Sequence, residues 1–323
     1  MSPMRLRCFA SSAVSLSAVS LSVVSLKVTS LCAAALFLAS CGEPAVEPAV
    51  SADAGEAVAP SVGEATFVVP SAGLPGEVTA LNANNNLDVV RHDGRVFLAY
   101  RTAPWHFAHE DVWLYVISSA DQAKWRFEGK FHLGTDLREP RFLSWNGSLW
   151  LFFAVLGKEL GKFEPGDARV AKYGSPGNWT EAKSMNRADF IPWRARVVDG
   201  KPYLIGYNNG GDVYAGGKIP NILVKVLTTE DGETWTPAFG DAANEGVVLK
   251  GGVSEVDFAF TPDGGLVAVG RNEAGDELGF GSKICTAKAG ALGDWTCSKD
   301  PRKYDSPLVF TRGGKVWLIG RRS

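Results

Sequence analysis

The sequence predicts an all-β fold, a β-propeller built from four-stranded blades. Three observations support this prediction. A short phrase with a tight turn between β-rich runs recurs along the chain, and a tryptophan that ends a second, polar turn recurs at a similar spacing. No long segment shows the 3.6-residue apolar period of a helix.

The first phrase reads Asp-Gly, Asn-Gly or Gly-Gly between apolar residues, as in Trp145-Asn146-Gly147-Ser148-Leu149. Such dipeptides tolerate the positive φ of two-residue hairpin turns, so each copy predicts a hairpin. The five copies carry their glycine at positions 94, 147, 200, 264 and 314, at steps of 53, 53, 64 and 50 residues.

The second phrase ends in Trp125, Trp179, Trp235 or Trp295, at steps of 54, 56 and 60 residues. Two hairpins per repeat make a four-stranded unit, which is a propeller blade. The repeats predict blades over residues 86–138, 139–192, 193–255 and 256–305, and a fifth that begins at Ser306 and is incomplete. Residues 64–69 are expected to return and add an outer strand to that last blade.

The first forty residues differ from the rest. Arg5, Arg7 and Lys27 are the only charges, and an apolar run over residues 31–38 leads to Leu38-Ala39-Ser40-Cys41. This is the pattern of a secretory signal, and its end resembles the bacterial lipobox, whose cysteine is acylated. We therefore predict a lipoprotein signal over 1–40, the lipidated Cys41 with a disordered tether over 41–64, and a propeller domain over 65–323.

The composition limits the kinds of binding partner that the sequence predicts. The formal net charge is −2, with no basic run that would attract nucleic acid or anionic lipid. Cys285 and Cys297 remain once the signal and the lipidated residue are set aside, and they are expected to form a disulfide across a hairpin. The segment His106–Asp111 holds two histidines and two carboxylates, which could ligate a metal, but a surface or substrate-facing loop is favoured. No cofactor is predicted, and we expect a monomer.

In a propeller, the start of each innermost strand and the end of the next strand meet at one face. The residues there form a charged and aromatic set, which predicts a binding or acid–base site in a central cavity. The inner-strand starts contribute Asp88, Arg138, Glu139, Trp193, Arg194, Glu255, Asp257, Tyr304 and Asp305. The second-strand ends contribute Arg101, Tyr207, Asn208, Arg271, Arg321 and Arg322.

Part of this pattern resembles the sialidase propellers. Thr228–Trp235 is similar to their Asp-box, a structural turn, and Ser118–Trp125 is a weaker copy. Glu255 and Arg271, 16 residues apart across one hairpin, resemble the sialidase glutamate and one of the three arginines that hold the sialic acid carboxylate. The resemblance implies that these two are neighbours, that Arg321 is a second clamp, and that Tyr304 is the candidate nucleophile. The sialidase Arg-Ile-Pro is replaced here by Asn84–Asp88.

A second resemblance points to five-bladed furanosidases. Arg138-Glu139-Pro140 is similar to their Arg-Asp-Pro, which would make Asp88, Glu139 and Glu255 the catalytic carboxylates. Both families act on sugars. The candidate catalytic residues are therefore Glu255, Asp88, Glu139, Tyr304 and Asp305, and the candidate substrate-binding residues are Arg101, Arg138, Arg194, Tyr207, Arg271 and Arg321.

Two kinds of function follow from this set. The first is a cell-envelope lipoprotein that hydrolyses a glycoside, and the alternative is a non-catalytic propeller that binds a glycan or a protein at the cell surface. A structural envelope protein without a small ligand is a third. The residue after Cys41 is Gly42, which by the enterobacterial rule points to the outer membrane or cell surface.

Overall fold

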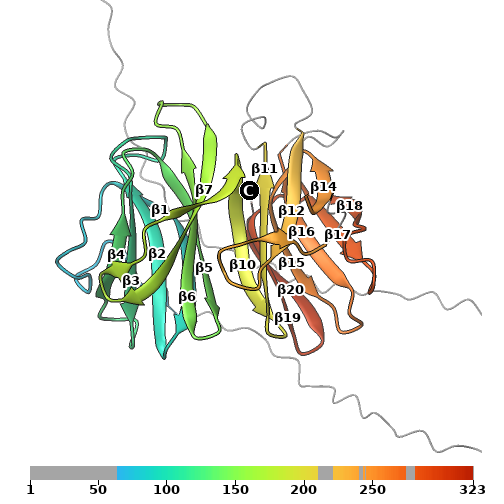
Figure 1. Ribbon diagram of the computed structural model, residues 1–323, viewed down its shortest axis with the longest axis horizontal. Coiled ribbons are helices and arrows are strands. Elements are labelled where there is room, and N and C mark those ends of the chain that lie inside the picture. The colour runs from blue at the N-terminus through green and yellow to red at the C-terminus, as the bar shows by residue number, and fades with distance from the viewer. Residues whose placement is uncertain (1–63, 210–220, 240–242, 244, 274–280, 323) are drawn as a thin grey trace, which may run out of the picture.

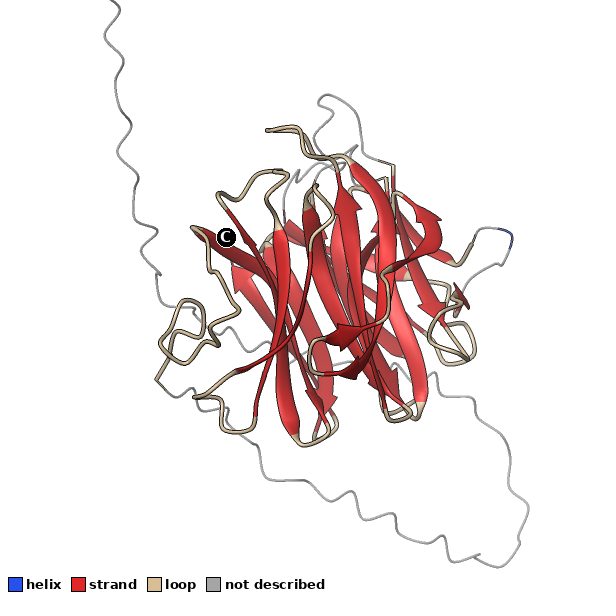
Figure 2. Cartoon of the chain, turned by 60° about the vertical axis from the view of Figure 1, so that its left-hand side comes forward, coloured by secondary structure: helices blue, strands red, loops and turns tan. Residues whose placement is uncertain are grey.

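The computed structural model describes residues 64–209, 221–239, 243, 245–273 and 281–322. The predicted signal and lipidated cysteine lie outside these residues, and so does all of the tether except Glu64. The described chain is built of strands β1 to β20, which lie side by side with their turns at two ends of the molecule (Figure 2). Within these residues, no helix has the length and apolar character needed to cross a membrane.

The strands form five consecutive antiparallel sheets, and the predicted β-propeller is confirmed (Figure 1). In the first and fourth sheets four strands follow in chain order. In the second and third, the outermost strand is split into two short pieces that both pair with the same neighbour. Blade 1 contains β1 (Ala83–His92), β2 (Arg95–Ala103), β3 (Trp113–Ser119) and β4 (Arg126–Phe131); blade 2 contains β5 (Leu137–Trp145), β6 (Ser148–Leu156), β7 (Pro165–Ser175), β8 (Asn178–Trp179) and β9 (Lys183–Ala188). Blade 3 contains β10 (Ile191–Val198), β11 (Lys201–Asn208), β12 (Ile222–Thr228), β13 (Thr236–Pro237) and β14 (Val247–Gly251); blade 4 contains β15 (Val253–Phe260), β16 (Leu266–Asn272), β17 (Gly281–Ala287) and β18 (Thr296–Asp300); blade 5 contains β19 (Tyr304–Arg312) and β20 (Lys315–Arg322).

The recurrent turns join the first two strands of every blade, as the repeat predicts, although the connection has two residues in blades 1, 2, 3 and 5 and five residues (261–265) in blade 4. In blade 2 the two turn residues Asn146 and Gly147 have φ of +48° and +69°. Both values lie in the left-handed region, where asparagine and glycine are the least strained residues. This turn conformation also fixes the register between β5 and β6.

A second kind of turn follows the third strand of blades 1 and 3 and has the same hydrogen bonds in both. The Asp231 carboxylate accepts hydrogen bonds from the backbone N–H groups of Glu233 and Thr234, at 2.8 and 2.6 Å. The Asp121 carboxylate does the same for the two equivalent N–H groups. These backbone hydrogen bonds hold the pKa of Asp121 and Asp231 at about 2. In both copies the carboxylate that closes the turn is that of the aspartate, Asp121 or Asp231, and not a side chain of the residue before it, Ala120 or Glu230.

The hydrophobic core lies between neighbouring blades, where the face of one sheet packs on the next. Phe97 and Leu114 of blade 1 pack against Phe142 and Phe153 of blade 2. Similar clusters fill the interfaces of blades 2 and 3, 3 and 4, and 4 and 5. Because the core is divided in this way, the innermost strands are free to carry polar residues toward the central axis.

The expected closure of the ring by residues 64–69 is wrong. These residues form no strand, and β20 pairs with no described strand other than β19. Val68 and Val69 pack instead on the outer face of blade 1, against Tyr100 and Tyr115 among others. This placement is favoured because that face is apolar and aromatic and would otherwise be exposed. Blade 5 is therefore a two-stranded hairpin, with a groove of about 720 Å³ between it and blade 4.

The predicted disulfide is confirmed. Cys285 of β17 and Cys297 of β18 are directly opposite each other in the ladder and are bonded. The bond closes a loop over a sequence separation of 12 residues. In the chain-entropy estimate, a loop of this size stabilises the fold by about 3 kcal/mol.

We expect the Cys285→Ser, Cys297→Ser double variant to lose about this much stability, because its unfolded chain regains the freedom that the cross-link removes. Urea unfolding of both proteins under non-reducing conditions measures the difference. Dithiothreitol should destabilise the wild type and leave the double variant unchanged. An equal effect of the reductant on both would contradict the assignment.

Candidate active site

Each innermost strand has a register shift near its start, at the same place in all five blades. Such a bulge bends the strand and re-aims the side chain that stands at it. The residues at the shift are Asn86 in β1, Glu139 in β5, Trp193 in β10, Glu255 in β15 and Ser306 in β19. Four of them have φ in the left-handed region, which is strained for any residue with a side chain.

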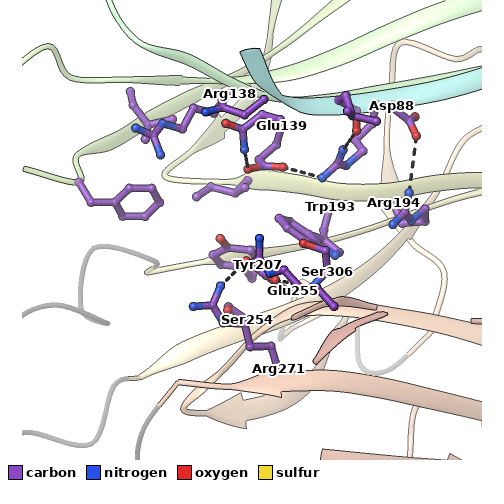
Figure 3. A pocket seen from close by; sticks show the side chains of 18 of the residues that line it. Asp88, Arg138, Glu139, Trp193, Arg194, Tyr207, Ser254, Glu255, Arg271 and Ser306 are labelled. Atoms are coloured by element: carbon purple, nitrogen blue, oxygen red, sulfur yellow. Dashed lines mark hydrogen bonds and ion pairs between the residues drawn. The ribbon is translucent and has the colours of Figure 1, made fainter. Parts of the chain in front are cut away.

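These five residues converge on one polar cavity of about 580 Å³ at the centre of the propeller. Figure 3 shows Glu139 and Glu255 on opposite sides of it, with Trp193 between them. Backbone strain that recurs at a cavity is typical of a functional site, because the surrounding fold must hold it in place. The geometry therefore defines a candidate active site with a glutamate at two of its five bulges.

Glu139 has a side chain that is 13% exposed, like that of Glu255, but its partners differ. One carboxylate oxygen accepts a hydrogen bond from the side-chain amide of Asn86, and the other is 2.5 Å from an Nη of Arg141. Burial raises the pKa of Glu139, and the negative charge of Glu255 acts in the same direction, although Arg141 opposes it. Glu139 therefore holds a proton at a higher pH than an ordinary glutamate.

Glu255 is surrounded by donors. One oxygen lies 2.6 Å from an Nη of Arg271, and the other accepts a hydrogen bond of 2.8 Å from the backbone N–H of Ser306. Both contacts fix the position of the Glu255 carboxylate in the cavity. The same cavity thus holds one glutamate in an environment that favours the proton and one bound by a cation and an N–H donor.

Arg271 is already neutralised by protein carboxylates. Its Nε lies 2.9 Å from both Glu273 and Asp305, in addition to the contact with Glu255. Burial lowers the pKa of Arg271, but the three carboxylates outweigh it and the net pKa is raised. Burial also raises the pKa of Glu273. An arginine that is bound in this way has little capacity left for a carboxylate on a substrate.

Asp88 and Asp257 occupy equivalent places, two residues after the bulge in blades 1 and 4. Asp88 accepts a hydrogen bond of 2.8 Å from the N–H of Phe142 in blade 2, and Asp257 one of 2.8 Å from the N–H of Val309 in blade 5. The guanidinium of Arg194 lies near both carboxylates: its Nη1 is 3.5 Å from Oδ1 of Asp88, and its Nε is 3.8 Å from Oδ2 of Asp257. Both carboxylates therefore join neighbouring inner strands, which is a structural task.

A network at the rim orients His106 toward the cavity. Arg101 donates to Oδ1 of Asn85 at 3.3 Å, so the Asn85 amide group points to Nδ1 of His106, at 3.0 Å. Nδ1 is then the acceptor and the proton of the neutral ring is on Nε2. Burial lowers the pKa of His106, and the positive charges of Arg138 and Arg101 act in the same direction. A neutral His106 can donate one hydrogen bond to a ligand.

The structure brings most of the predicted site residues together but not all of them. The predicted residues that line the cavity are Asp88, Arg138, Glu139, Trp193, Arg194, Tyr207, Glu255, Arg271 and Arg321. Asp305 lies behind Arg271 and is 5% exposed, and Arg101 is completely buried against Asp136. The prediction of Tyr304 as nucleophile is not supported, because its ring is buried among Ala259, Val269 and Val309.

Sequence reasoning missed Asn86, Arg141, Glu273 and Ser306, which also line the cavity. A signal for two of them was present. Asn86, Glu139, Trp193, Glu255 and Ser306 follow one another at steps of 53, 54, 62 and 51 residues, close to the steps of the turn glycines. Aligning the repeats on Glu139 and Glu255 would have selected Asn86 in place of Asp88.

Among the residues that the structure describes, no group of three or more His, Cys, Asp or Glu is placed to hold a metal ion. In the segment His106–Asp111, the two histidines have different partners. His106 faces Asn85 at the cavity, whereas Nδ1 of His109 accepts a hydrogen bond from the backbone N–H of Asp111.

Comparisons with solved structures place the fold. The sialidase of Trypanosoma rangeli has a TM-score of 0.51 and 14% identity over 74% of this chain and 43% of its own. Zg3597, a family 117 glycoside hydrolase of the marine bacterium Zobellia galactanivorans, has a TM-score of 0.48 and 13% identity over 72% of this chain and 74% of its own. The α-L-arabinanase of Penicillium chrysogenum has a TM-score of 0.46 and 11% identity over 73% and 76%.

No protein-family model matches the sequence, and no curated protein matches it significantly. The chain spans less than half the length of the sialidase it matches. At this identity the likeness concerns the fold alone, and the chain has a β-propeller fold like that of the sialidase.

Proposed function

We propose that this protein hydrolyses a glycosidic bond, with Glu139 as the proton donor and Glu255 as the carboxylate that faces it. The observation that carries the proposal is the pair of glutamates at the bulges of blades 2 and 4, which face each other across one cavity and have different partners. Burial in addition raises the pKa of Glu139. Two carboxyl groups with separated roles are what glycoside hydrolysis requires.

In this mechanism Glu139 transfers its proton to the glycosidic oxygen while the bond from that oxygen to the anomeric carbon breaks. The Glu255 carboxylate either bonds to the anomeric carbon or takes a proton from the water that does so. Arg271 and the N–H of Ser306 hold Glu255 in place. Arg141 would stabilise the Glu139 carboxylate once its proton has left.

The arrangement favours a sugar without a carboxylate over sialic acid. Arg271 already contacts three protein carboxylates, and Asn86 stands at the first bulge, in the region where sialidases carry an arginine. Arg194 likewise faces Asp88 and Asp257. A neutral sugar, bound through its hydroxyl groups by His106, Tyr207 and the amide of Asn86, fits these partners better.

A second candidate is a propeller that binds a glycan without cleaving it. The observation in its favour is that Asp88, the third carboxylate of the furanosidase-like set, has both oxygens engaged with Phe142 and Arg194. Of that set of three carboxylates, only Glu139 and Glu255 are then left for chemistry. Two carboxylates suffice for hydrolysis, but they do not make up the three-carboxylate arrangement of that family.

We further propose that the chain is a cell-envelope lipoprotein anchored through Cys41, on the strength of its signal pattern, and acts as a monomer at the outer membrane or cell surface. The two equivalent polar turns of blades 1 and 3 support the assignment of degenerate Asp-boxes. Mass spectrometry of the N-terminal peptide, compared with a Cys41→Ser variant, tests the acylation.

The activity is tested with a panel of fluorogenic glycosides, including arabinofuranoside, galactoside, xyloside and sialoside, after a cooperative thermal melt has been recorded. We expect release from one neutral glycoside. A folded protein that is inert on the whole panel but binds an oligosaccharide would favour the second candidate.

We expect kcat/KM to fall with rising pH, because the proton donor must be protonated and its pKa is raised above that of an ordinary glutamate. Above that pKa the rate should drop about tenfold per pH unit. A pH–rate profile of the hydrolysed glycoside measures this alkaline limb. A rate that stays constant from below pH 4.5 up to pH 9 would remove Glu139 from the role of acid.

A further inference from the structure

The loop between β2 and β3 carries two large exposed aromatic side chains, one on either side in sequence of a residue that lines the cavity. Trp105 is 45% exposed and Phe107 is 57% exposed, and His106 between them lines the cavity. Aromatic rings of this size contribute strongly to binding when they are covered. Two of them exposed next to a polar cavity indicate a contact surface.

The backbone carbonyls of this loop accept hydrogen bonds from two arginines, Arg101 and Arg138. The completely buried Arg101 donates from one Nη to the carbonyl of Trp105 at 3.4 Å and from the other to the carbonyl of Phe107 at 3.0 Å. Arg138 donates to the carbonyl of His106 at 2.7 Å. Asp136 in turn binds both arginines, at 2.9 and 2.7 Å.

This support fixes the direction of the side chains. Burying an arginine is costly unless its donors are satisfied, and here three donors of Arg101 bind Asp136 and two carbonyls of the loop. With the three successive carbonyls held by these arginines, His106 lines the cavity, while the side chains of Trp105 and Phe107 next to it are exposed. The ring of Trp105 also meets His109 edge-on, with centroids 4.7 Å apart.

We propose that Trp105 and Phe107 form a stacking platform for a second sugar unit, so that the substrate is a neutral oligosaccharide or polysaccharide and not a single glycoside. The proposal rests on the proposed function and adds its substrate class. One unit occupies the cavity, and the next unit lays the apolar face of its ring on the aromatic rim. His106 connects the cavity with the proposed platform. Its side chain lines the cavity, and the centroid of its ring lies 6.1 Å from that of the Phe107 ring.

The platform is tested by chain length with the full protein in detergent. Isothermal titration would compare arabinotetraose, xylotetraose, cellotetraose and galactotetraose with the corresponding monosaccharides. We expect one tetraose to bind at least tenfold more tightly than its monosaccharide. In the Trp105→Ala, Phe107→Ala double variant, binding of that tetraose should weaken about 10- to 100-fold while monosaccharide binding is unchanged.

The matched control is Phe67→Ala, which removes an aromatic side chain that is 73% exposed and does not line the cavity. It should alter neither affinity. Equal tetraose binding by wild type and double variant, or no preference for any tetraose over its monosaccharide, would overturn the platform. Because the readout is binding, a protein that fails to hydrolyse any glycoside but needs Trp105 and Phe107 for tetraose binding would lose the proposed hydrolysis and keep the platform.

Discussion

The Glu255→Gln variant is expected to hydrolyse its glycoside about 10³-fold more slowly than the wild type while keeping the fold. The substitution is isosteric and retains an oxygen for Arg271, which lies 2.6 Å from the carboxylate. It removes the negative charge that the reaction needs opposite Glu139. Initial rates on the glycoside found in the panel measure the loss, and thermal melts recorded in parallel report the fold.

Glu110→Gln is the matched control for this change. Glu110 belongs to the loop between β2 and β3, where it is exposed and pairs with the exposed Lys158, at 3.1 Å. Exposed pairs of this kind contribute little to stability, so both the melt and the rate should remain as in the wild type. Full activity in Glu255→Gln would remove that residue from the mechanism and leave Glu139 without a partner.

The architecture could be predicted because its signals are local. Tight turns such as Asn146-Gly147 require positive φ, and few residues accept it, so the five hairpins are visible in the sequence itself. The same local logic placed Glu255 at the start of one strand and Arg271 at the end of its partner. The structure brings their side chains within 2.6 Å of each other.

The site was predicted less completely, because side chains alternate along a strand and a bulge shifts that alternation by one residue. Within a single blade the sequence does not mark the bulge, which emerges only when the repeats are aligned on Glu139 and Glu255. Asp88 was therefore chosen over Asn86, which stands at the actual bulge of β1. A similar error affected β19. Its bulge residue is Ser306, and Tyr304 belongs to the core between blades 4 and 5.

Ring closure was mispredicted for a different reason. Residues 64–69 carry apolar side chains that suit either an outer strand or a packed coil, and a pattern of this length does not distinguish them. The aromatic face of blade 1, with Tyr100 and Tyr115, decides in favour of packing. Such competition between surfaces that are distant in the sequence is a tertiary effect.

The Asp257→Ala variant is expected to lose about 3–5 kcal/mol of stability, the largest effect of any single substitution considered for this fold. Asp257 is completely buried and joins three blades. It binds an Nη of Arg196 from blade 3, and it accepts a hydrogen bond of 2.8 Å from the N–H of Val309 in blade 5. Its removal leaves a largely buried guanidinium and a buried N–H without this acceptor.

Urea unfolding measures the loss, and Asp257→Asn separates its two causes. The amide can still accept the hydrogen bond from Val309, but it no longer neutralises Arg196, so its cost should lie between zero and that of the alanine variant. Asp263→Ala is the surface control, since its carboxylate serves only the local turn at Thr261 and Gly265. A loss for Asp257→Ala no larger than for this control would mean that blade 5 is held by its apolar contacts around Val309, and that the ion pair at the centre of the propeller adds no net stability.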